Sequence, residues 1–325
     1  MQKKGFPSWL KTRAALKESP LSLRRLKVSK RIETYLEERK ILVDKALKEF
    51  MPEPSGLAGD VIRAMNYTLF AGGKRIRPVL CIAGSEAVGG SADDVVPVAC
   101  AIELIHAYSL IHDDLPVMDN DDFRRGKPTS HKVFGEAVAL LAGDGLLTLA
   151  FNLMARCGVE KKGEKSALLR VIDLISSAAG YEGMIGGQVV DISYEGKDPD
   201  PTVVNYIHTH KTGALIAASV TAGTILAGGS EEEVQSINRY GQQIGLAFQI
   251  ADDILNIEGD RNLMGKGTGS DKERGKITYP SVFGIKESRN IQRKSIDRAI
   301  ESLNRFNERA QPLRDLARYI INRKL

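Results

Sequence analysis

A dense run of acidic side chains is the feature of this sequence best suited to chemistry. Residues 105–128, IHAYSLIHDDLPVMDNDDFRRGKP, contain five aspartates within ten positions, followed directly by two arginines. Such neighbouring carboxylates repel one another unless water or cations neutralise them. Oxygen ligands of this kind suit Mg²⁺, which keeps several waters and bridges to substrate phosphates. A solvated acidic loop is the alternative interpretation of this segment taken alone.

The local sequence predicts that two of these carboxylates return to one place. Pro116 disfavours helical backbone at Leu115, so the apolar helix before it should end near Asp114. Asp119 would then fold back toward Asp113. We therefore expect the pair at the inner end of a buried element.

A second polar cluster lies in GLAFQIADDILN, residues 245–256. Helical spacing places four of its side chains on one face of an otherwise apolar helix: Gln249, Asp252, Asp253 and Asn256. A polar stripe on a helix that should be buried must face a wet cavity, a metal or a partner. Two acidic clusters in one helical domain predict a shared multi-metal site.

Basic residues occur in three further segments, where each alone is typical of a solvated surface charge. They are Lys74 and Arg77 in AGGKRIRP, Lys211 beside Thr212 in HTHKTGALI, and Lys266 and Lys276 in GKGTGSDKERGK. Taken with the carboxylates, these cations favour a site for polyanions, and diphosphates fit best.

The elements that must position these groups are helical along nearly the whole chain. Apolar residues recur at helical spacing in nine segments: 32–50, 61–70, 79–88, 95–112, 137–155, 168–179, 213–227, 231–255 and 291–303. Several lack a wide polar face and must be buried on most sides. Alternation typical of strands between hairpin turns is absent from the sequence. The pattern predicts one large all-α domain of about ten helices over residues 31–325.

The charge distribution sets the N-terminal segment apart. Residues 1–30 carry nine Lys or Arg and one acid, so they account for more than the whole net charge of +5. The remainder is slightly acidic, which argues against nucleic-acid binding by the whole protein. We interpret residues 1–30 as a disordered basic extension. An amphipathic targeting or membrane-surface segment is the alternative.

The cysteines and apolar stretches indicate a soluble cytoplasmic protein. Cys81, Cys100 and Cys157 lack disulfide or metal-ligand spacing and are expected to be free thiols in a reducing compartment. The longest uncharged stretch, 213–229, is short for a bilayer span and rich in small residues. We expect no stable membrane insertion, since no hydrophobic signal-peptide core lies near Met1.

Six motifs together resemble the trans-isoprenyl diphosphate synthase family. GGKRIRP, DDLPVMD followed by RR, GGQVVD, HKTGALI, FQIADDILN and GKITYP occur in the family's order and approximate spacing over residues 30–325. The resemblance implies the isoprenoid synthase fold, with helices around a central cavity. It also implies a Mg²⁺-dependent prenyltransferase that joins isopentenyl diphosphate to dimethylallyl or geranyl diphosphate, and a homodimer with helices such as 95–112 at its interface.

The resemblance assigns roles to individual residues. Asp113 and Asp119 would coordinate two Mg²⁺ ions with Asp114 in support, and Asp252 would coordinate a third. The allylic diphosphate would be held by Arg124, Lys211 and Lys266, and the isopentenyl diphosphate by Lys74, Arg77, His106 and Arg125. Oxygens of Thr212 and Gln249 would face the allylic cation, with Gln188 and Asp191 beside the allylic substrate. Asp253 and Lys276 join the catalytic and substrate-binding sets, while His112 is expected to form structural hydrogen bonds.

Product length is expected to depend on the residues just before the first acidic motif. Ser109 lies about one helical turn below Asp113, whereas Tyr108 lies about 140° round the helix, so helix geometry does not place Tyr108 in a pocket. The resemblance does, because bacterial farnesyl diphosphate synthases carry an aromatic residue there and plant-type geranylgeranyl synthases usually carry a smaller or more flexible one. We predict a farnesyl product. A geranylgeranyl product, with Tyr108 as ordinary core, is the alternative.

Two other classes of protein share part of this pattern. A terpene cyclase also uses an Asp-rich motif and Mg²⁺, but it would not need GGKRIRP for a second diphosphate. A non-catalytic subunit that modulates a partner synthase would typically lose the acidic motifs. Here the first motif is complete and the second nearly so.

Asn256 is a departure from the family pattern, which has Asp at this position. Asn keeps one ligand oxygen but loses a charge. We therefore expect the variant Asn256→Asp to need less Mg²⁺ for its half-maximal rate. Titration of activity with Mg²⁺ measures this, and an unchanged requirement would refute a role for Asn256 in metal affinity.

Overall fold

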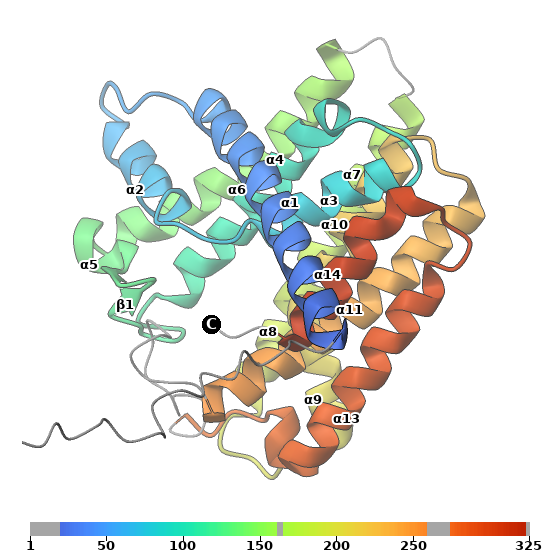
Figure 1. Ribbon diagram of the computed structural model, residues 1–325. Coiled ribbons are helices and arrows are strands. Elements are labelled where there is room, and N and C mark those ends of the chain that lie inside the picture. Colours follow the sequence, from blue (N-terminus) through green and yellow to red (C-terminus); the bar gives the residue numbers. More distant parts are fainter. Residues whose placement is uncertain (1–19, 161–164, 259–273, 323–325) are drawn as a thin grey trace, which may run out of the picture.

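The computed structural model describes residues 20–160, 165–258 and 274–322, and nearly all of them are helical (Figure 1). The first half contains α1 (Pro20–Phe50), α2 (Gly59–Leu69), α3 (Ile76–Ala87), α4 (Ala92–Asp113), α5 (Ser130–Phe134), α6 (Glu136–Glu160) and α7 (Lys165–Ala179). The second half contains α8 (Met184–Ser193), α9 (Pro201–Ile207), the π-helix η2 (His208–Gly213), α10 (Ala214–Leu226), α11 (Glu231–Glu258), α13 (Tyr279–Ser302), the short η3 (Glu308–Ala310) and α14 (Gln311–Asn322). A two-residue antiparallel hairpin, β1 (Phe123–Arg124) and β2 (Lys127–Pro128), follows α4.

Helix α10 forms the centre of the domain. Its side chains from Leu215 to Ile225 are all buried, and they contribute to both large hydrophobic cores. One core includes α4 and α6, and the other includes α11, α13 and α14. Helix α3 approaches α10 closely because a Cβ at Gly223 would lie 1.8 Å from the carbonyl oxygen of Cys81. The shared central helix makes the predicted all-α domain a single unit.

All nine predicted helices are present, and sequence patterning missed others. Helix α8 contains adjacent glycines, Gly186 and Gly187, and β-branched residues, which lower helix propensity. Helices α9 and α14 were also missed, as was the hairpin of β1 and β2, which is too short to show strand alternation. Of these, α8 and the hairpin line or support the functional site, as does the π-helix η2.

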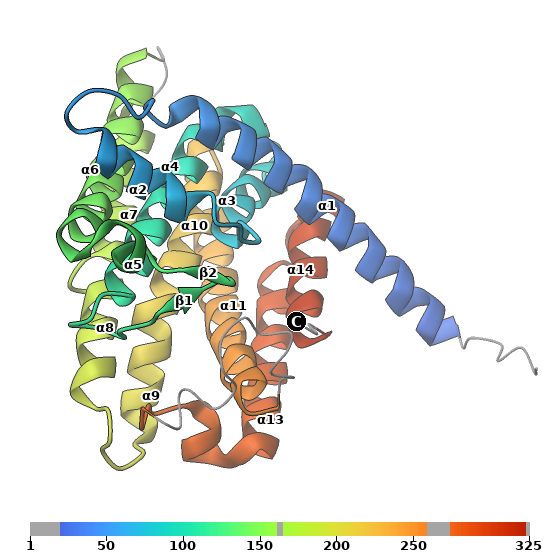
Figure 2. The same cartoon turned by 90° about the vertical axis from the view of Figure 1, so that its left-hand side faces the viewer.

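The predicted N-terminal extension needs a correction, because α1 begins at Pro20. The backbone from residue 20 to residue 30 is helical, and Figure 2 shows this end of α1 projecting beyond the body of the protein. Proline is favoured in the first turn of a helix, and Leu, Arg and Lys are good helix formers, so the segment continues α1. The assignment of residues 1–19 as an extension lies outside the described residues.

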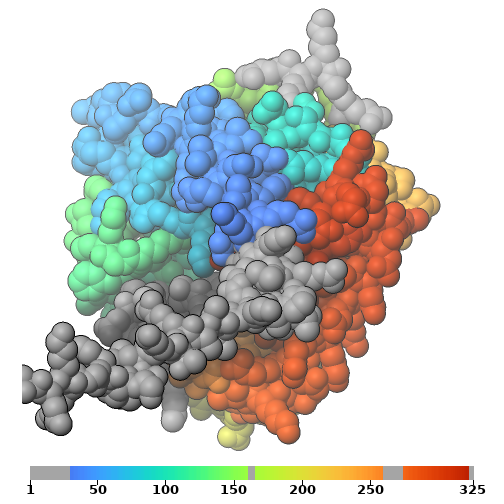
Figure 3. Space-filling model, in the orientation of Figure 1, coloured from blue at the N-terminus to red at the C-terminus, as the bar shows by residue number. Residues whose placement is uncertain are grey.

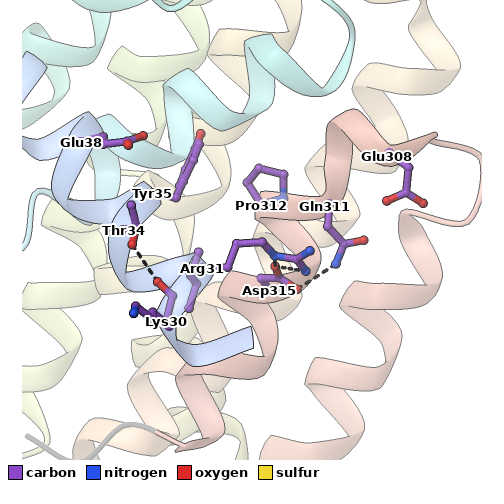
Figure 4. Close-up of a pocket in the computed structure, with 10 residues that line it drawn as sticks. Lys30, Arg31, Thr34, Tyr35, Glu38, Glu308, Gln311, Pro312 and Asp315 are labelled. Atoms are coloured by element: carbon purple, nitrogen blue, oxygen red, sulfur yellow. Dashed lines mark hydrogen bonds and ion pairs between the residues drawn. The ribbon is translucent and has the colours of Figure 1, made fainter. Parts of the chain in front are cut away.

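The first and last described helices are joined by an ion pair between the buried Asp315 and the exposed Arg31. Figure 3 shows α1 lying against the C-terminal segment, and Figure 4 shows Arg31 and Gln311 pointing toward Asp315. Asp315 is buried, and its carboxylate accepts hydrogen bonds from Arg31 Nε at 2.7 Å and Gln311 Nε2 at 2.8 Å. A surface groove of about 650 Å³ lies over this junction. The contact fixes α1 onto α14 at a distance from the acidic motifs.

Two helices among the described residues are long and apolar enough to cross a membrane. They are α4, whose most apolar stretch is 72% buried within the protein, and the segment 136–159 of α6, which is 39% buried. The burial of α4 is that of a core helix. Helix α6 instead leaves apolar side chains on the surface, including Leu140 and Leu141.

Candidate active site

The first acidic motif adopts the geometry that its sequence predicts. Helix α4 ends at Asp113, and Asp114 is its C-cap. The backbone N–H of Asp119 donates to the carbonyl oxygen of Asp113 at 2.8 Å, so the loop folds back onto the helix end. Burial raises the pKa of Asp113, to which the nearby Asp119 carboxylate adds. A carboxylate in this position is stabilised by a bound cation.

Asp114 supports the site through the hairpin. Its side chain is 2% exposed, and Arg124 Nε lies 2.7 Å from each of its two carboxylate oxygens. Arg124 in β1 is thereby fixed beside the end of α4, with a longer contact of 3.6 Å to Asp121. This ion pair gives the first of the two arginines after the acidic run a structural role.

Cations from the segment before α13 approach the same loop. Lys276 Nζ lies 3.2 Å from Asp119 Oδ1 and 3.7 Å from Asp191 Oδ2. Arg274, which sequence reasoning did not single out, lies 2.8 Å from Asp119 and 2.5 Å from Asp121. Lys266 lies outside the described residues. The structure therefore brings Lys276 to the first acidic motif across 157 residues of sequence.

The π-helix η2 presents Lys211 and Thr212 to the same region. Its wider turn directly precedes α10, and π-helical segments are frequent at functional sites. Gly187 of α8 allows close backbone contact, because a Cβ there would lie 2.2 Å from the Lys211 backbone nitrogen. Lys211 Nζ lies 2.6 Å from Asp191 Oδ2. Although burial alone would raise the pKa of Asp191, Lys211 and Lys276 hold it below its usual value.

The second acidic motif divides its residues between two environments. Asp252 is partly exposed, whereas Asp253 is buried and bonded to His208 Nε2 at 2.7 Å and to the backbone N–H of Tyr279 at 2.9 Å. Gln249 Oε1 accepts a hydrogen bond from the Thr212 hydroxyl at 2.9 Å. The predicted catalytic role of Asp253 stays a prediction, and its contacts are those of a buried anchor.

The turn in GGKRIRP is fixed by the buried side chain of Arg75, a residue that the sequence analysis did not single out. Arg75 has a left-handed backbone (φ 52°) and is 4% exposed. Its guanidinium contacts Asp44 of α1 at 2.8 Å, Glu103 of α4 at 2.7 Å and the carbonyl oxygen of Leu69 at 2.7 Å. These three partners fix the backbone on both sides of Arg75. Lys74 is consequently left on the exposed side.

Three other basic groups, those of Arg77, His106 and Arg125, lie close enough to influence one another's pKa. Burial, with the charges of Arg77 and Arg125, holds the pKa of His106 well below its usual value. Burial also lowers the pKa of Arg77, whose Nε has no hydrogen-bond partner among the described residues. The Arg125 guanidinium donates to the carbonyl oxygen of Gly72. Clustered cations that lower one another's pKa in this way would gain from a bound polyanion.

A cavity of about 520 Å³ runs from these cations past Asp113. It is lined by Arg77, His106, Tyr108, Ser109, Leu110, His112, Asp113, Leu115, Val117, Met118, Leu140, Met184, Ile185, Gln188, Val189, Ile192, Lys211 and Thr212. Tyr108 is one of these lining residues and is 6% exposed, so it lies in the wall of the cavity, which is the position that the resemblance implies. His112 Nε2 lies 3.0 Å from the Leu140 carbonyl oxygen, which is the structural contact expected of it.

The carboxylates suit magnesium as a partner of diphosphate. Within the described residues, no three His, Cys, Asp or Glu side chains converge closely enough to hold a metal ion by themselves. Of the predicted ligands, Asp113 lines the basic, partly apolar cavity, Asp119 folds back to the same helix end, and Asp252 of α11 is partly exposed. Mg²⁺ characteristically completes such a set with water and substrate phosphate oxygens. The residues present therefore fit Mg²⁺ that arrives with a diphosphate.

Clustered cations beside a partly apolar cavity fit diphosphates that carry apolar tails, and comparison with known proteins shows the family of this chain. The polyprenyl synthetase family profile matches residues 60–317, and the chain belongs to this family of prenyltransferases. It is 48% identical over 254 residues to the farnesyl diphosphate synthase of Geobacillus stearothermophilus, covering 78% of this chain and 85% of that one. It is 44% identical over 291 residues to the geranylgeranyl diphosphate synthase of Cyanophora paradoxa, covering 89% and 96%.

A solved structure shows the same fold. An FPP/GFPP synthase from Zymomonas mobilis superposes with a TM-score of 0.81 at 36% identity, covering 90% of this chain and 99% of that one. The predicted family and fold are thus confirmed.

The residues that sequence reasoning missed are mainly the partners of those it found. Arg75 lies within GGKRIRP and Arg274 within the Gly-rich loop, so composition marked both segments without distinguishing the cations in them. Glu103 is three residues before His106 on α4, which places it about one turn away. A lone Glu in an otherwise apolar helix was the available signal, because such a charge must be paired.

We expect Glu103→Gln to weaken the anchor of Arg75. Loss of one charged hydrogen-bond partner in a buried site should reduce the free energy of unfolding by roughly 1.5–3 kcal/mol. Urea-induced unfolding measures this. Asp60→Asn, which breaks an exposed pair with Arg63, is the matched control and should cost less than about 1 kcal/mol. Equal effects of the two variants would show that Glu103 does not anchor the turn.

Proposed function

We propose that this prenyltransferase joins isopentenyl diphosphate to dimethylallyl and geranyl diphosphate to give farnesyl diphosphate. The observation that carries the proposal is the position of Tyr108, which lines the cavity on the same helix as Asp113, just below the end that holds the acidic motif. An aromatic ring there would stop the growing chain. The names of the relatives include both farnesyl and geranylgeranyl synthases, so the family alone leaves the product open.

The charged residues would bind the two diphosphates on different sides of the cavity. Arg124, Lys211 and Lys266 would hold the allylic diphosphate, and Lys74, Arg77, His106 and Arg125 the isopentenyl diphosphate. Asp113, Asp119 and Asp252 are the residues that would hold Mg²⁺, three ions per site by resemblance. Bound there, Mg²⁺ would neutralise the diphosphate oxygens and stabilise the leaving group.

The reaction exchanges one bond for another inside an apolar cavity. The allylic C–O bond breaks, diphosphate leaves with the bonding electrons, and the double bond of isopentenyl diphosphate attacks the resulting cation. The product forms when a proton is lost, and the released diphosphate is the expected base. Apolar walls such as Leu115 and Met184 exclude water from the cation, and the Thr212 oxygen faces it. Clustered cations near the diphosphates stabilise their negative charge.

The test is elongation by the purified protein. We expect Mg²⁺-dependent farnesol, after dephosphorylation, from dimethylallyl or geranyl diphosphate, with little extension of farnesyl diphosphate. The variant Tyr108→Ala should lengthen the product, because removal of the ring deepens the cavity, whereas Tyr108→Phe should leave it unchanged. Gas chromatography of the alcohols measures chain length.

The other outcomes separate the alternatives. Geranylgeraniol as the main wild-type product, or an unaltered product from Tyr108→Ala, would overturn Tyr108 as the stop. Absence of elongation with every primer would favour a non-catalytic subunit that modulates a partner synthase.

The surface of the cavity supports the predicted homodimer, and we propose an interface over α6 and α8 in place of the predicted one at α4. Helix α4 is packed within the protein's own core. Several residues that line the cavity are exposed in a single chain, namely Val117, Leu140, Ile185, Val189 and Ile192. A contiguous apolar surface of this kind indicates an interaction site, and a second copy would shield the cavity from water.

We expect the protein to sediment with twice the mass of one chain. Leu141 of α6 is 56% exposed and does not line the cavity, so Leu141→Glu should dissociate the dimer without altering the site directly. Leu57→Glu, on an exposed loop residue, is the matched control and should leave the mass unchanged. A monomeric wild-type protein at assay concentration would contradict the proposal.

The cellular compartment is proposed to be the cytoplasm. Cys81, Cys100 and Cys157 form no disulfide within the described residues; the first two are buried and Cys157 is half-buried. Free thiols of this kind are typical of a reducing compartment.

A further inference from the structure

Asp253 lies at the centre of a hydrogen-bonded network that joins three elements. Its Oδ2 accepts from His208 Nε2 of η2 at 2.7 Å and from the backbone N–H of Tyr279, the first residue of α13, at 2.9 Å. Its Oδ1 accepts from Gln249 Nε2 of α11 at 3.2 Å. With Asp253 and His208 each 3% exposed, the network is shielded from water. Both carboxylate oxygens are therefore used within the protein.

The carboxylate determines which way the Gln249 amide faces. A side-chain amide has one end that donates and one that accepts, whereas an ionised carboxylate only accepts. Gln249 must therefore turn its NH₂ group toward Asp253, which leaves Oε1 facing Thr212. The Thr212 hydroxyl donates to that oxygen at 2.9 Å. The amide orientation thus follows from the network itself.

The direction of the Thr212 hydroxyl matters for the cavity that this residue lines. Its proton is committed to Gln249, so the lone pairs of Oγ1 remain for the cavity, and Gln249 itself is not among the lining residues. An oxygen lone pair stabilises nearby positive charge, whereas a hydroxyl proton pointed the same way would oppose it. The polarity of this wall is therefore set two hydrogen bonds away, at Asp253.

We propose that Asp253 is a positioning residue that fixes the Gln249 amide and, through it, directs the Thr212 oxygen toward the developing allylic cation. The inference rests on the proposed prenyl transfer and extends it to a residue that does not touch substrate. The adjacent Asp252 differs, because it is partly exposed and would hold a metal ion. The two acids of the second motif would then serve separate purposes.

The variant Asp253→Asn reverses the polarity of the network while preserving its shape. Asparagine can keep its oxygen toward His208 and Tyr279, and its NH₂ group then faces Gln249. The Gln249 amide must flip, Nε2 faces Thr212, and the Thr212 proton turns toward the cavity. We expect kcat to fall on the order of 10- to 100-fold. Both substrate KM values and the Mg²⁺ requirement should stay within about twofold, because no binding group for diphosphate or metal is removed.

The exchange variant, which combines Asp253→Asn with Gln249→Glu, is the decisive measurement. It swaps an amide and a carboxylate without changing net charge, so the introduced asparagine donates to the introduced glutamate and the original hydrogen bond is reversed in direction. The other oxygen of that glutamate accepts from Thr212, which restores the hydroxyl direction. We expect the exchange to recover most of the lost kcat. Gln249→Glu alone brings two carboxylates together and should be less active than the exchange variant.

A control and three outcomes complete the test. His210→Gln changes a half-buried residue of η2 that lines a different pocket from the one lined by Thr212, and it should retain full activity. Thermal unfolding establishes that both variants are folded. An exchange variant that is then no more active than Asp253→Asn would overturn the inference. A tenfold higher Mg²⁺ requirement for Asp253→Asn would also overturn it. Inactivity of the wild type would instead remove the proposed function. In that case the Tm tests the hydrogen-bond network: recovery by the exchange variant of the Tm lost in Asp253→Asn supports it, and no recovery contradicts it.

Discussion

Charge balance inside an apolar helical bundle is the constraint on which the rest of this structure depends. Carboxylates and guanidinium groups are costly to bury unless they are paired. Each pair here joins two different structural elements. Asp114 pairs with Arg124 of the hairpin, Asp191 with Lys211 of η2, and Asp119 with Lys276 before α13. The pairs therefore assemble the loops around one cavity. In the proposed reaction these positioned groups would receive a diphosphate and its metal, so the pairing that stabilises the fold would also prepare the site.

Close backbone packing gives these pairs their positions. Gly187 lies against the backbone of Lys211, and a Cβ at Gly245 would lie 2.7 Å from the Cα of Gly213, so η2 contacts neighbouring helices near its middle and at its C-terminal end. A larger residue at either glycine would push the π-helix away from α8 or α11. Arg75 is held differently, by ion pairs with Asp44 of α1 and Glu103 of α4. Helical segments thus carry Arg77, His106 and Lys211, whereas ion pairs hold Arg124 of the hairpin and Lys276 of the segment before α13.

The cavity wall divides into a buried part and a part that a single chain leaves open. Tyr108 and Met184 are buried, which suits a surface that determines chain length. Val189 and Ile185 are exposed, which is unfavourable for a cavity that must exclude water and accounts for the proposed second copy. Helix α8 contributes to both parts of the wall, because Met184 lies in the buried part and Ile185 and Val189 lie in the open part.

The sequence by itself determined the elements and the chemistry that they carry. Helical periodicity marked α4, α10 and α11, and the proline after the first acidic pair predicted the return of Asp119 to Asp113, since both effects act over a few residues. Tertiary structure alone decided which charges face each other. Arg75 and Lys74 are adjacent in sequence yet one is buried and the other exposed, and Asp252 and Asp253 differ likewise. Periodicity fixes the face of a helix on which a side chain lies, but its partner depends on the helix packed opposite, which no local pattern records.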